Sequence, residues 1–151
     1  MCRTSCLSGT FADTSLRTCV STCSSTPALF SYDLGNLCLP ECINGLFADN
    51  STRSCVTGCP NGTYADSSTY RCVWECPTKP LTFGDNLTNT CENSCSISHD
   101  RYADNASRIC VIHCPNGTFA DPISRSCKDT CPSGYFAVNS TKRCEQNCPS
   151  N

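Results

Sequence analysis

The spacing of the cysteines is the strongest constraint on how this chain can fold. Its 18 cysteines fall into nine C-x3-C pairs, and the segments between successive pairs hold 12, 14, 12, 12, 14, 14, 12 and 12 residues. This period predicts one tandem array over residues 1–151, made of eight repeats of 17 or 19 residues and belonging to a longer array. The segments closed by cysteines are 6–19, 23–38, 42–55, 59–72, 76–91, 95–110, 114–127 and 131–144.

Each repeat carries the same short motif between its cysteines. An aromatic residue stands eight positions before the cysteine that ends each segment. These aromatic residues are Phe11, Phe30, Phe47, Tyr64, Phe83, Tyr102, Phe119 and Phe136. A small residue follows, then Asp in six repeats, and Arg is the commonest residue two positions before the cysteine. Because Asp side chains bond their own backbone two residues on, the motif predicts a small hairpin with the ring near the returning Cys and Val.

The composition argues against a conventional globular core. Cysteine exceeds the roughly 8–10% of residues that marks a disulfide scaffold, whereas Leu, Ile, Val and Phe together number only 25. So little apolar side chain cannot offset the chain entropy of one large globule. We therefore expect a small disulfide-rich fold, an extended rod or solenoid of short β-hairpin repeats that is mostly irregular and has no large core. The cysteine content also predicts an oxidising compartment, outside the cell or on its surface.

The spacing alone is compatible with three disulfide patterns. Bonds within each C-x3-C pair would close very small loops and constrain the chain little. Bonds across each segment would close loops worth about 3 kcal/mol each in the chain-entropy model. Interlocked bonds, first cysteine to first and second to second, would close longer loops but leave one pair over, because the number of pairs is odd.

The stretch CVTGCPNGTYADSSTYRC, from Cys55 to Cys72, resembles the cysteine-rich repeats of furin-like and growth-factor-receptor ectodomains. It is even more similar to the tandem CPxGTYADxSTRxCV repeats of surface proteins in ciliates and other protists. In the receptor modules the second cysteine of one pair bonds the first of the next. The resemblance thus implies the disulfides Cys6–Cys19, Cys23–Cys38, Cys42–Cys55, Cys59–Cys72, Cys76–Cys91, Cys95–Cys110, Cys114–Cys127 and Cys131–Cys144. Cys2 and Cys148 are then left over, and we expect them to bond further repeats or other copies of the chain.

Six N-x-S/T sequons predict N-linked glycans, which would be the chain's covalent modification. They are at Asn50, Asn61, Asn86, Asn105, Asn116 and Asn139. Four of them stand at the predicted hairpin tip, five positions before the closing cysteine, and the other two follow Cys-Pro. The competing explanation is that Asn, Ser and Thr are simply good turn formers, so that sequons arise by chance.

Other chemistry finds little support in the sequence. The net charge of −2 has no basic stripe for nucleic acid, and no apolar run is long enough for a membrane span in this segment. Zinc sites use C-x2-C or C-x4-C spacing rather than C-x3-C, so we expect no metal and no cofactor. The repeated Asp is expected to cap a turn rather than bind calcium. His99 and His113 share no repeat position, and near-identical repeats leave no place for a unique catalytic constellation, so no enzyme activity is expected.

These observations favour an extracellular structural glycoprotein that forms a surface coat or filament with glycans on the repeat tips. Its expected partners are copies of itself, joined head to tail in a homopolymer, and glycans. The alternative is the ligand-recognition stalk of a receptor or a variable surface antigen. In that case the long segments 23–38, 76–91 and 95–110 would form the binding patch, and the single tryptophan, Trp74, would either anchor an interface or cover a neighbouring disulfide.

Overall fold

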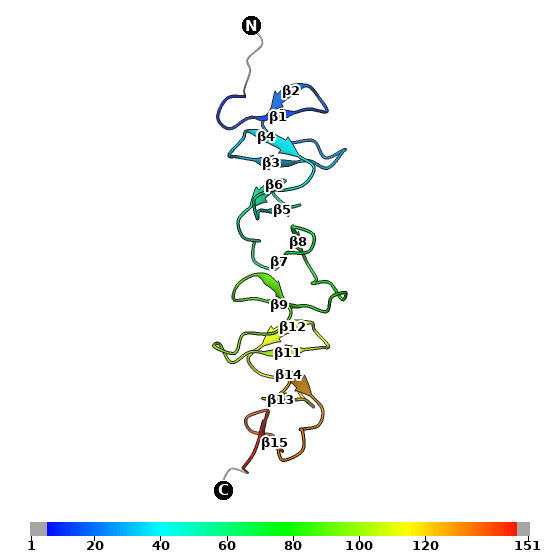
Figure 1. The fold of residues 1–151 in the computed structure, drawn as a ribbon, viewed down its shortest axis with the longest axis vertical. Helices are drawn as coiled ribbons and strands as arrows, with labels where there is room; N and C mark the ends of the chain where they lie inside the picture. Colours follow the sequence, from blue (N-terminus) through cyan, green and yellow to red (C-terminus); the bar gives the residue numbers. More distant parts are fainter. Residues whose placement is uncertain (1–5, 148–151) are drawn as a thin grey trace. The chain divides into compact units, whose positions relative to one another are not determined.

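The computed structural model describes residues 6–147, in which each repeat forms one hairpin of two three-residue strands and no helix occurs (Figure 1). The strands are β1 (Phe11–Asp13), β2 (Thr18–Val20), β3 (Phe30–Tyr32), β4 (Leu37–Leu39), β5 (Phe47–Asp49), β6 (Ser54–Val56), β7 (Tyr64–Asp66), β8 (Arg71–Val73), β9 (Phe83–Asp85), β10 (Thr90–Glu92), β11 (Tyr102–Asp104), β12 (Ile109–Val111), β13 (Phe119–Asp121), β14 (Ser126–Lys128), β15 (Phe136–Val138) and β16 (Arg143–Glu145). The predicted disulfide-rich fold of short hairpin repeats is confirmed.

The repeated motif builds both strands of each hairpin. In the first hairpin, Phe11 lies opposite Val20 and Ala12 lies opposite Cys19. The residue two positions before the closing cysteine has a positive φ, between 49° and 59°, in all eight repeats. These residues are Arg17, Asn36, Arg53, Tyr70, Asn89, Arg108, Arg125 and Lys142. A left-handed residue therefore ends every hairpin turn just before the second strand begins.

The turn before each hairpin separates short repeats from long ones. In the short repeats a glycine stands two positions before the aromatic residue with a φ of 75–87°, a conformation that costs glycine little. In the long repeats this turn is wider, because an N–H bonds the carbonyl five residues earlier. Leu29 bonds Ser24 at 2.9 Å, and Thr82 bonds Pro77 at 3.1 Å. The two extra residues of the long repeats thus replace the glycine turn.

One disulfide closes each hairpin. Each bond joins the second cysteine of one C-x3-C pair to the first cysteine of the next pair, with Cα atoms 5.5–5.7 Å apart. The bonds are Cys6–Cys19, Cys23–Cys38, Cys42–Cys55, Cys59–Cys72, Cys76–Cys91, Cys95–Cys110, Cys114–Cys127 and Cys131–Cys144. Cys2 and Cys148 lie outside the described residues, so their expected bonds stay a prediction.

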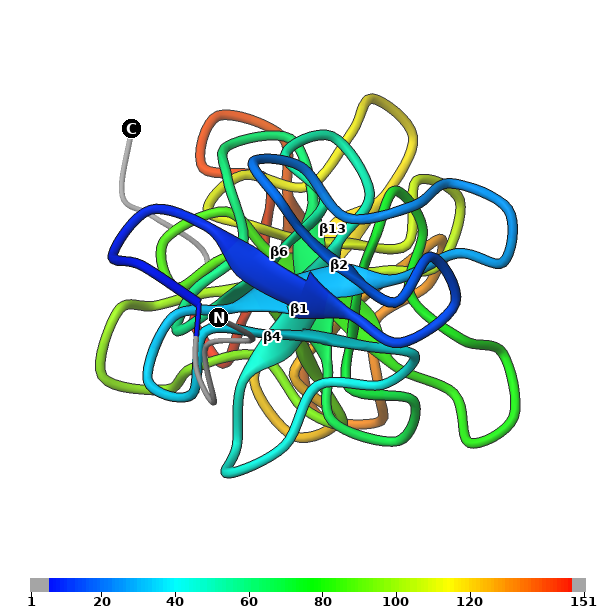
Figure 2. The same cartoon turned by 90° about the horizontal axis from the view of Figure 1, so that it is seen from above.

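Contacts divide the chain into two compact units, Met1–Trp74 and Glu75–Asn151. In each unit, the first strand of a hairpin pairs in parallel with the second strand of the next hairpin, as Ala12 does with Leu37. The strand order is β2-β1-β4-β3-β6-β5-β8-β7 in the first unit and β10-β9-β12-β11-β14-β13-β16-β15 in the second. Seen from above, the loops of the first unit point outward around its strands (Figure 2). The grouping of all eight repeats into one array stays a prediction.

The small core lies between repeats rather than within them. Phe30 of the second repeat packs in one cluster with Cys42 and Ala48 of the third. Tyr102 packs in the same way with residues of the seventh repeat, Cys114, Ala120 and Cys127. In four repeats the aromatic residue does lie opposite its own Val across the hairpin, as the motif predicts, but the disulfide that the ring covers belongs to the following repeat.

Candidate functional site: the interface between repeats

Backbone hydrogen bonds join successive hairpins at one position of the repeat. The N–H of the small residue in the middle of the first strand donates to the carbonyl of the left-handed residue in the next repeat, at 2.8–2.9 Å. The donor–acceptor pairs are Ala12–Asn36, Ser31–Arg53, Ala48–Tyr70, Gly84–Arg108, Ala103–Arg125 and Ala120–Lys142. The positive φ therefore does more than end a turn, because it turns a carbonyl toward the preceding repeat.

At four of the six described junctions, the side chain of the same left-handed residue lies on the aromatic ring of the preceding repeat. The Arg53 guanidinium is 5.1 Å from the centre of the Phe30 ring, and the Arg125 guanidinium is 4.1 Å from that of Tyr102. Where this residue is Tyr70, its ring stacks on Phe47 with centroids 6.3 Å apart. Cation–π attraction thus favours Arg at this position in the repeats of Arg53 and Arg125.

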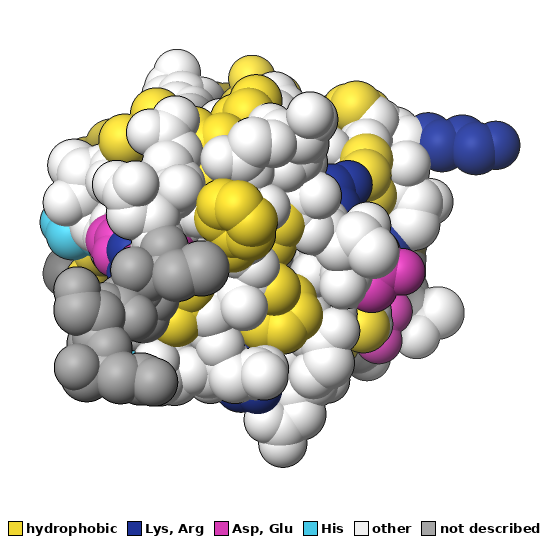
Figure 3. Space-filling model, turned by 90° about the horizontal axis from the view of Figure 1, so that it is seen from below, with side chains coloured by type: hydrophobic (Ala, Val, Ile, Leu, Met, Phe, Trp, Pro, Cys, Tyr) yellow, Lys and Arg dark blue, Asp and Glu magenta, His cyan; other side chains and the backbone are white. Residues whose placement is uncertain are grey.

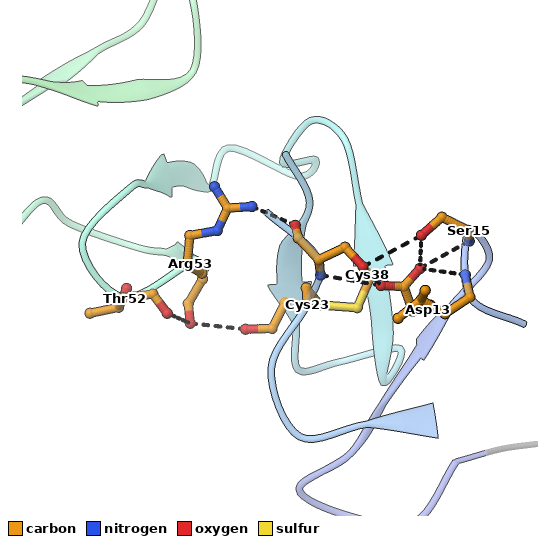
Figure 4. Close-up of a disulfide and its surroundings, with 10 residues drawn as sticks. Asp13, Ser15, Cys23, Cys38, Thr52 and Arg53 are labelled. Atoms are coloured by element: carbon orange, nitrogen blue, oxygen red, sulfur yellow. Dashed lines mark hydrogen bonds between the residues drawn. A yellow bond between two sulfur atoms is a disulfide. The ribbon is translucent and has the colours of Figure 1, made fainter. Parts of the chain in front are cut away.

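Hydrogen bonds from the guanidinium groups hold the arginines in place. Arg53 donates through Nη2 to the Ser24 carbonyl at 2.5 Å, beside the Cys23–Cys38 disulfide (Figure 4). Arg125 donates to the Arg101 carbonyl at 2.8 Å. The Nε atoms of Arg53 and Arg125 are buried without a hydrogen-bond partner, so their Nη groups and the ring contact carry the interaction.

The Asp that recurs in six repeats caps the hairpin turn from a buried position. In all six repeats that have it, one carboxylate oxygen accepts the N–H two residues on at 2.8–3.1 Å. Asp13 also accepts hydrogen bonds from the backbone and hydroxyl of Ser24, in the next repeat (Figure 4). Hydrogen bonds from Ser15 and then Ser24 lower the pKa of Asp13. The carboxylate is therefore held ionised by the turn and, in this repeat, by its neighbour.

Burial and hydrogen bonding oppose each other at the other capping carboxylates. Burial raises the pKa of Asp49, but the hydrogen bonds from Thr52 and Ser51 outweigh it, so that this pKa lies below the ordinary value. The pKa of Asp66 is lowered by the same balance, with Thr69 as the first donor. With their oxygens engaged in this way, the Asp side chains cap turns.

Two repeats do without the Asp. In the second repeat the position holds Tyr32, whose hydroxyl accepts a hydrogen bond from the Asn44 side chain of the next repeat at 2.9 Å. In the last repeat it holds Val138, which is buried. Tyr32 therefore keeps this position in contact with the next repeat, and both replacements remove the charged cap.

An ionic cluster in the second unit was not predicted from the sequence. Asp100 lies 3.7 Å from Arg125, forms an ion pair with Arg143, and accepts a hydrogen bond from the Tyr102 hydroxyl at 3.0 Å. The bond from Arg143 is the main cause of the lowered pKa of Asp100. Asp100 stands two positions before the aromatic residue, where the short repeats have glycine and no other repeat has an acid, so no recurrence could reveal it.

All six sequon asparagines are exposed and lie in turns. They are Asn50, Asn61, Asn86, Asn105, Asn116 and Asn139. Exposure makes these side chains accessible to a glycosylating enzyme, and glycosylation itself stays a prediction.

The two histidines and the cysteine beside one of them have ordinary structural roles. Cys114, next to His113, is bonded to Cys127. His99 contacts the hydroxyls of Ser96 and Ser98 at 3.0 Å. Among residues 6–147, no three His, Cys, Asp or Glu side chains come together as metal ligands would. In the same residues no helix is long and apolar enough to cross a bilayer.

The two terminal hairpins expose opposite halves of the repeat interface. Thr18 and Cys19 of β2 are exposed, and so is Arg17 directly before this strand. On β15, Phe136 is 55% exposed, whereas the equivalent Phe30 is fully buried. Viewed from below, hydrophobic side chains lie on the surface in the middle of the face (Figure 3).

Comparisons with family models, with curated proteins and with solved structures found no match. The disulfides in every described repeat suggest that the protein folds in an oxidising environment. The interface between repeats is the feature of the described residues that bears most directly on function.

Proposed function

We propose that this protein is an extracellular structural glycoprotein whose disulfide-bonded repeats assemble head to tail into a surface coat or filament. It has no catalytic role. The resemblance of its repeats to the cysteine-rich modules of receptor ectodomains and protist surface proteins supports the extracellular location. N-linked glycans on the exposed turns form a hydrated layer around the assembly, and the other partner of each chain is a second copy of itself.

The observation that carries this proposal is the complementarity of the two exposed edges. Within the units, every described junction joins a first strand to the second strand of the next repeat through the same backbone hydrogen bond, and four of these six junctions add the ring contact. β15 presents the first-strand half of this junction and β2 presents the second-strand half. A chain that makes one contact repeatedly thus exposes both halves of it.

In the assembly, β2 of one copy pairs in parallel with β15 of another. The Ala137 N–H donates to the Arg17 carbonyl, and the Arg17 guanidinium lies on the Phe136 ring. Such strand addition uses the unpaired backbone groups of an edge strand. The contact joins different surfaces of the two copies, so each added copy presents a free edge for the next one, as the growth of a filament requires.

The experiment compares the assembly of the secreted chain with that of Ala137→Pro, by sedimentation velocity and electron microscopy. Proline removes the donating N–H from an edge strand, and we expect the association constant to fall at least about tenfold. Ala137→Ser keeps the N–H and is the matched control. Each is repeated in a Cys2→Ser, Cys148→Ser background, which separates strand pairing from intermolecular disulfides. Chains that stay monomeric at all concentrations in the unmodified form would contradict the proposal.

The wide turns of the long repeats favour ligand recognition as a second candidate function. Leu81 and Ile97 are 51% and 75% exposed in these turns, where the repeat pattern is broken. Such apolar side chains are suited to an interface with another protein. If recognition is the main role, Ile97→Asp would abolish attachment of the labelled chain to the surface of its source cells, while Ala137→Pro would leave attachment unchanged.

A further inference from the structure

A groove in the first unit brings together two sequons from different repeats and the single tryptophan. Its volume is about 170 Å³, and its lining includes Asn50, Ser51, Pro60, Asn61 and Trp74. Asn50 stands at the tip of the third hairpin, whereas Asn61 lies in the first turn of the fourth repeat. The groove is smaller than the roughly 300–1,000 Å³ of sites for drug-sized ligands, so it suits a single ring.

Trp74 forms an apolar wall of this groove. Its side chain is 75% exposed, and its Cζ3 atom is 3.9 Å from the position that a Cβ on Gly62 would take. The indole thus lies near the backbone of the turn that holds Asn61, while most of its surface faces solvent. An exposed indole with polar groups beside it can contact the C–H face of a sugar ring and leave the hydroxyls to the polar groups.

The rest of the lining is polar and carries little available charge. The only ionisable side chain there is Asp49, which is 3% exposed. Its carboxylate accepts hydrogen bonds from Ser51 and Thr52 at 2.7–2.9 Å and so is already engaged. The Asn50 amide can both donate and accept hydrogen bonds. This surface fits a neutral ligand with many hydroxyl or amide groups better than an ion.

We propose that the Trp74 groove binds an N-acetylhexosamine ring, and that its occupant is the first sugar of the N-glycan attached to Asn61 or Asn50. The inference rests on the glycosylation in the proposed function. A glycan attached at the rim is present at a high effective concentration, so even a weak contact is occupied. The bound sugar then fixes the direction in which the glycan leaves the repeat.

The chain contains a matched control for this site. Asn105, Asn116 and Asp129 follow Asn50, Asn61 and Trp74 at an interval of 55 residues in each case. The two sequons are thus repeated in the second unit with an acid in place of the indole. A glycan at Asn116 has no aromatic face at this position and should be more mobile.

The first experiment uses the fluorescence of Trp74, which reports on this groove alone because the chain has one tryptophan. The protein is made in a eukaryotic secretory host and, without glycans, in a bacterial periplasm. With glycan attached, we expect acrylamide quenching to fall about twofold, since a sugar covers one face of the ring. Asn61→Gln or Asn50→Gln should restore the quenching, and Asn105→Gln with Asn116→Gln should not. Unchanged quenching on a chain that mass spectrometry shows to be glycosylated at both sites overturns the inference.

The second experiment adds free N,N′-diacetylchitobiose to the glycan-free protein. A saturable change in Trp74 emission that is lost in Asn61→Ala shows that the groove itself recognises the sugar, whether attached or supplied by another glycoprotein. No change up to about 10 mM, a concentration expected to detect even millimolar affinity, overturns the site. Bare asparagines in the secreted protein would instead refute the proposed glycoprotein, and the chitobiose titration would still decide whether the groove binds sugar.

Discussion

Phe30 and Phe136 occupy the same place in the repeat but have opposite environments. Each is the first residue of a three-residue strand, in a hairpin closed by one disulfide. Phe30 is fully buried against Cys42 and Ala48 of the next repeat, with the Arg53 guanidinium over its ring. Phe136 is 55% exposed. A hairpin of this kind therefore forms in either setting, but a core forms only where a following repeat covers the ring.

This difference places the stabilising energy at the junctions. Each hairpin contributes half of a core, and the stability of a stacked array is close to a sum over repeats and nearest-neighbour interfaces. An edge repeat lacks one of these interface terms. Equivalent substitutions in an interior and an edge repeat should thus change the free energy of unfolding by different amounts, and the difference is the contribution of one interface.

The largest effect is expected from removing the ring. Phe30→Ala deletes a fully buried aromatic side chain and should cost about 3–5 kcal/mol, whereas Phe136→Ala should stay within about 0.5 kcal/mol. Urea unfolding without reductant, followed by circular dichroism at a dilution where the chain is monomeric, measures both. Equal losses for the two substitutions would show that the ring stabilises its own hairpin rather than the junction.

The next effect comes from the arginine that covers the ring. Arg125→Ala removes the bond to the Arg101 carbonyl and the contact with the Tyr102 ring, and should cost about 1–3 kcal/mol. Arg17→Ala, at the exposed edge, should change stability by less than about 0.5 kcal/mol. Arg125→Lys keeps a cation but not the planar group, so its urea midpoint should fall between those of the unmodified protein and Arg125→Ala. A midpoint for Arg125→Lys equal to that of Arg125→Ala would show that charge alone contributes nothing.

The repeat fold could be predicted because its information is local. The aromatic–small–Asp motif and the cysteine period lie within one repeat, and they indicated a small disulfide-rich hairpin array. Spacing narrowed the disulfides only to three patterns, since each closes a feasible loop. The frequency of Arg before the closing cysteine was visible, but the ring contact of Arg53 and Arg125 was not, because the ring belongs to the preceding repeat.

The contacts between repeats could not be predicted from the sequence. Asp100 pairs with Arg125 and Arg143 from two later repeats, and no other repeat has an acid at this position. Trp74 meets Asn50 and Asn61 only because one hairpin tip lies beside the first turn of the next repeat. Neither arrangement has a periodic signal, and both depend on how the hairpins stack.

A smaller difference between interior and edge repeats should appear in acid. Burial raises the pKa of Asp121, but bonds from the Ser124 hydroxyl and the Ile123 N–H outweigh it and leave the pKa lowered. A carboxylate with a lowered pKa contributes its full stability above the unfolded value of about 3.9 and loses it as the pH falls through the folded value. The last repeat has Val138 at this position and should contribute no such dependence.

Val138→Asp tests this difference directly, because the following residues Asn139, Ser140 and Thr141 match those after Asp49. We expect the variant to gain stability between pH 3 and pH 6 that the unmodified protein lacks, while Asp121→Asn should lose part of its own. Urea midpoints at the two pH values give both results. A Val138→Asp protein whose midpoint is no more pH-dependent than that of the unmodified chain would show that the cap needs a following repeat.

The smallest effect concerns the left-handed residue itself. Its backbone conformation costs a non-glycine residue about 1 kcal/mol, which glycine avoids while losing more entropy on folding. Arg17→Gly, at the exposed edge, has no ring contact to lose and should be neutral or stabilising by up to about 0.5 kcal/mol. Arg53→Gly relieves the same strain but gives up the Phe30 contact and the Ser24 bond, so it should be net destabilising by about 1 kcal/mol. A rise in the urea midpoint for Arg17→Gly and a fall for Arg53→Gly would show that the turn needs only the backbone of this residue, whereas the junction needs its side chain. Falls of equal size in the two variants would mean that the arginine stabilises its own hairpin.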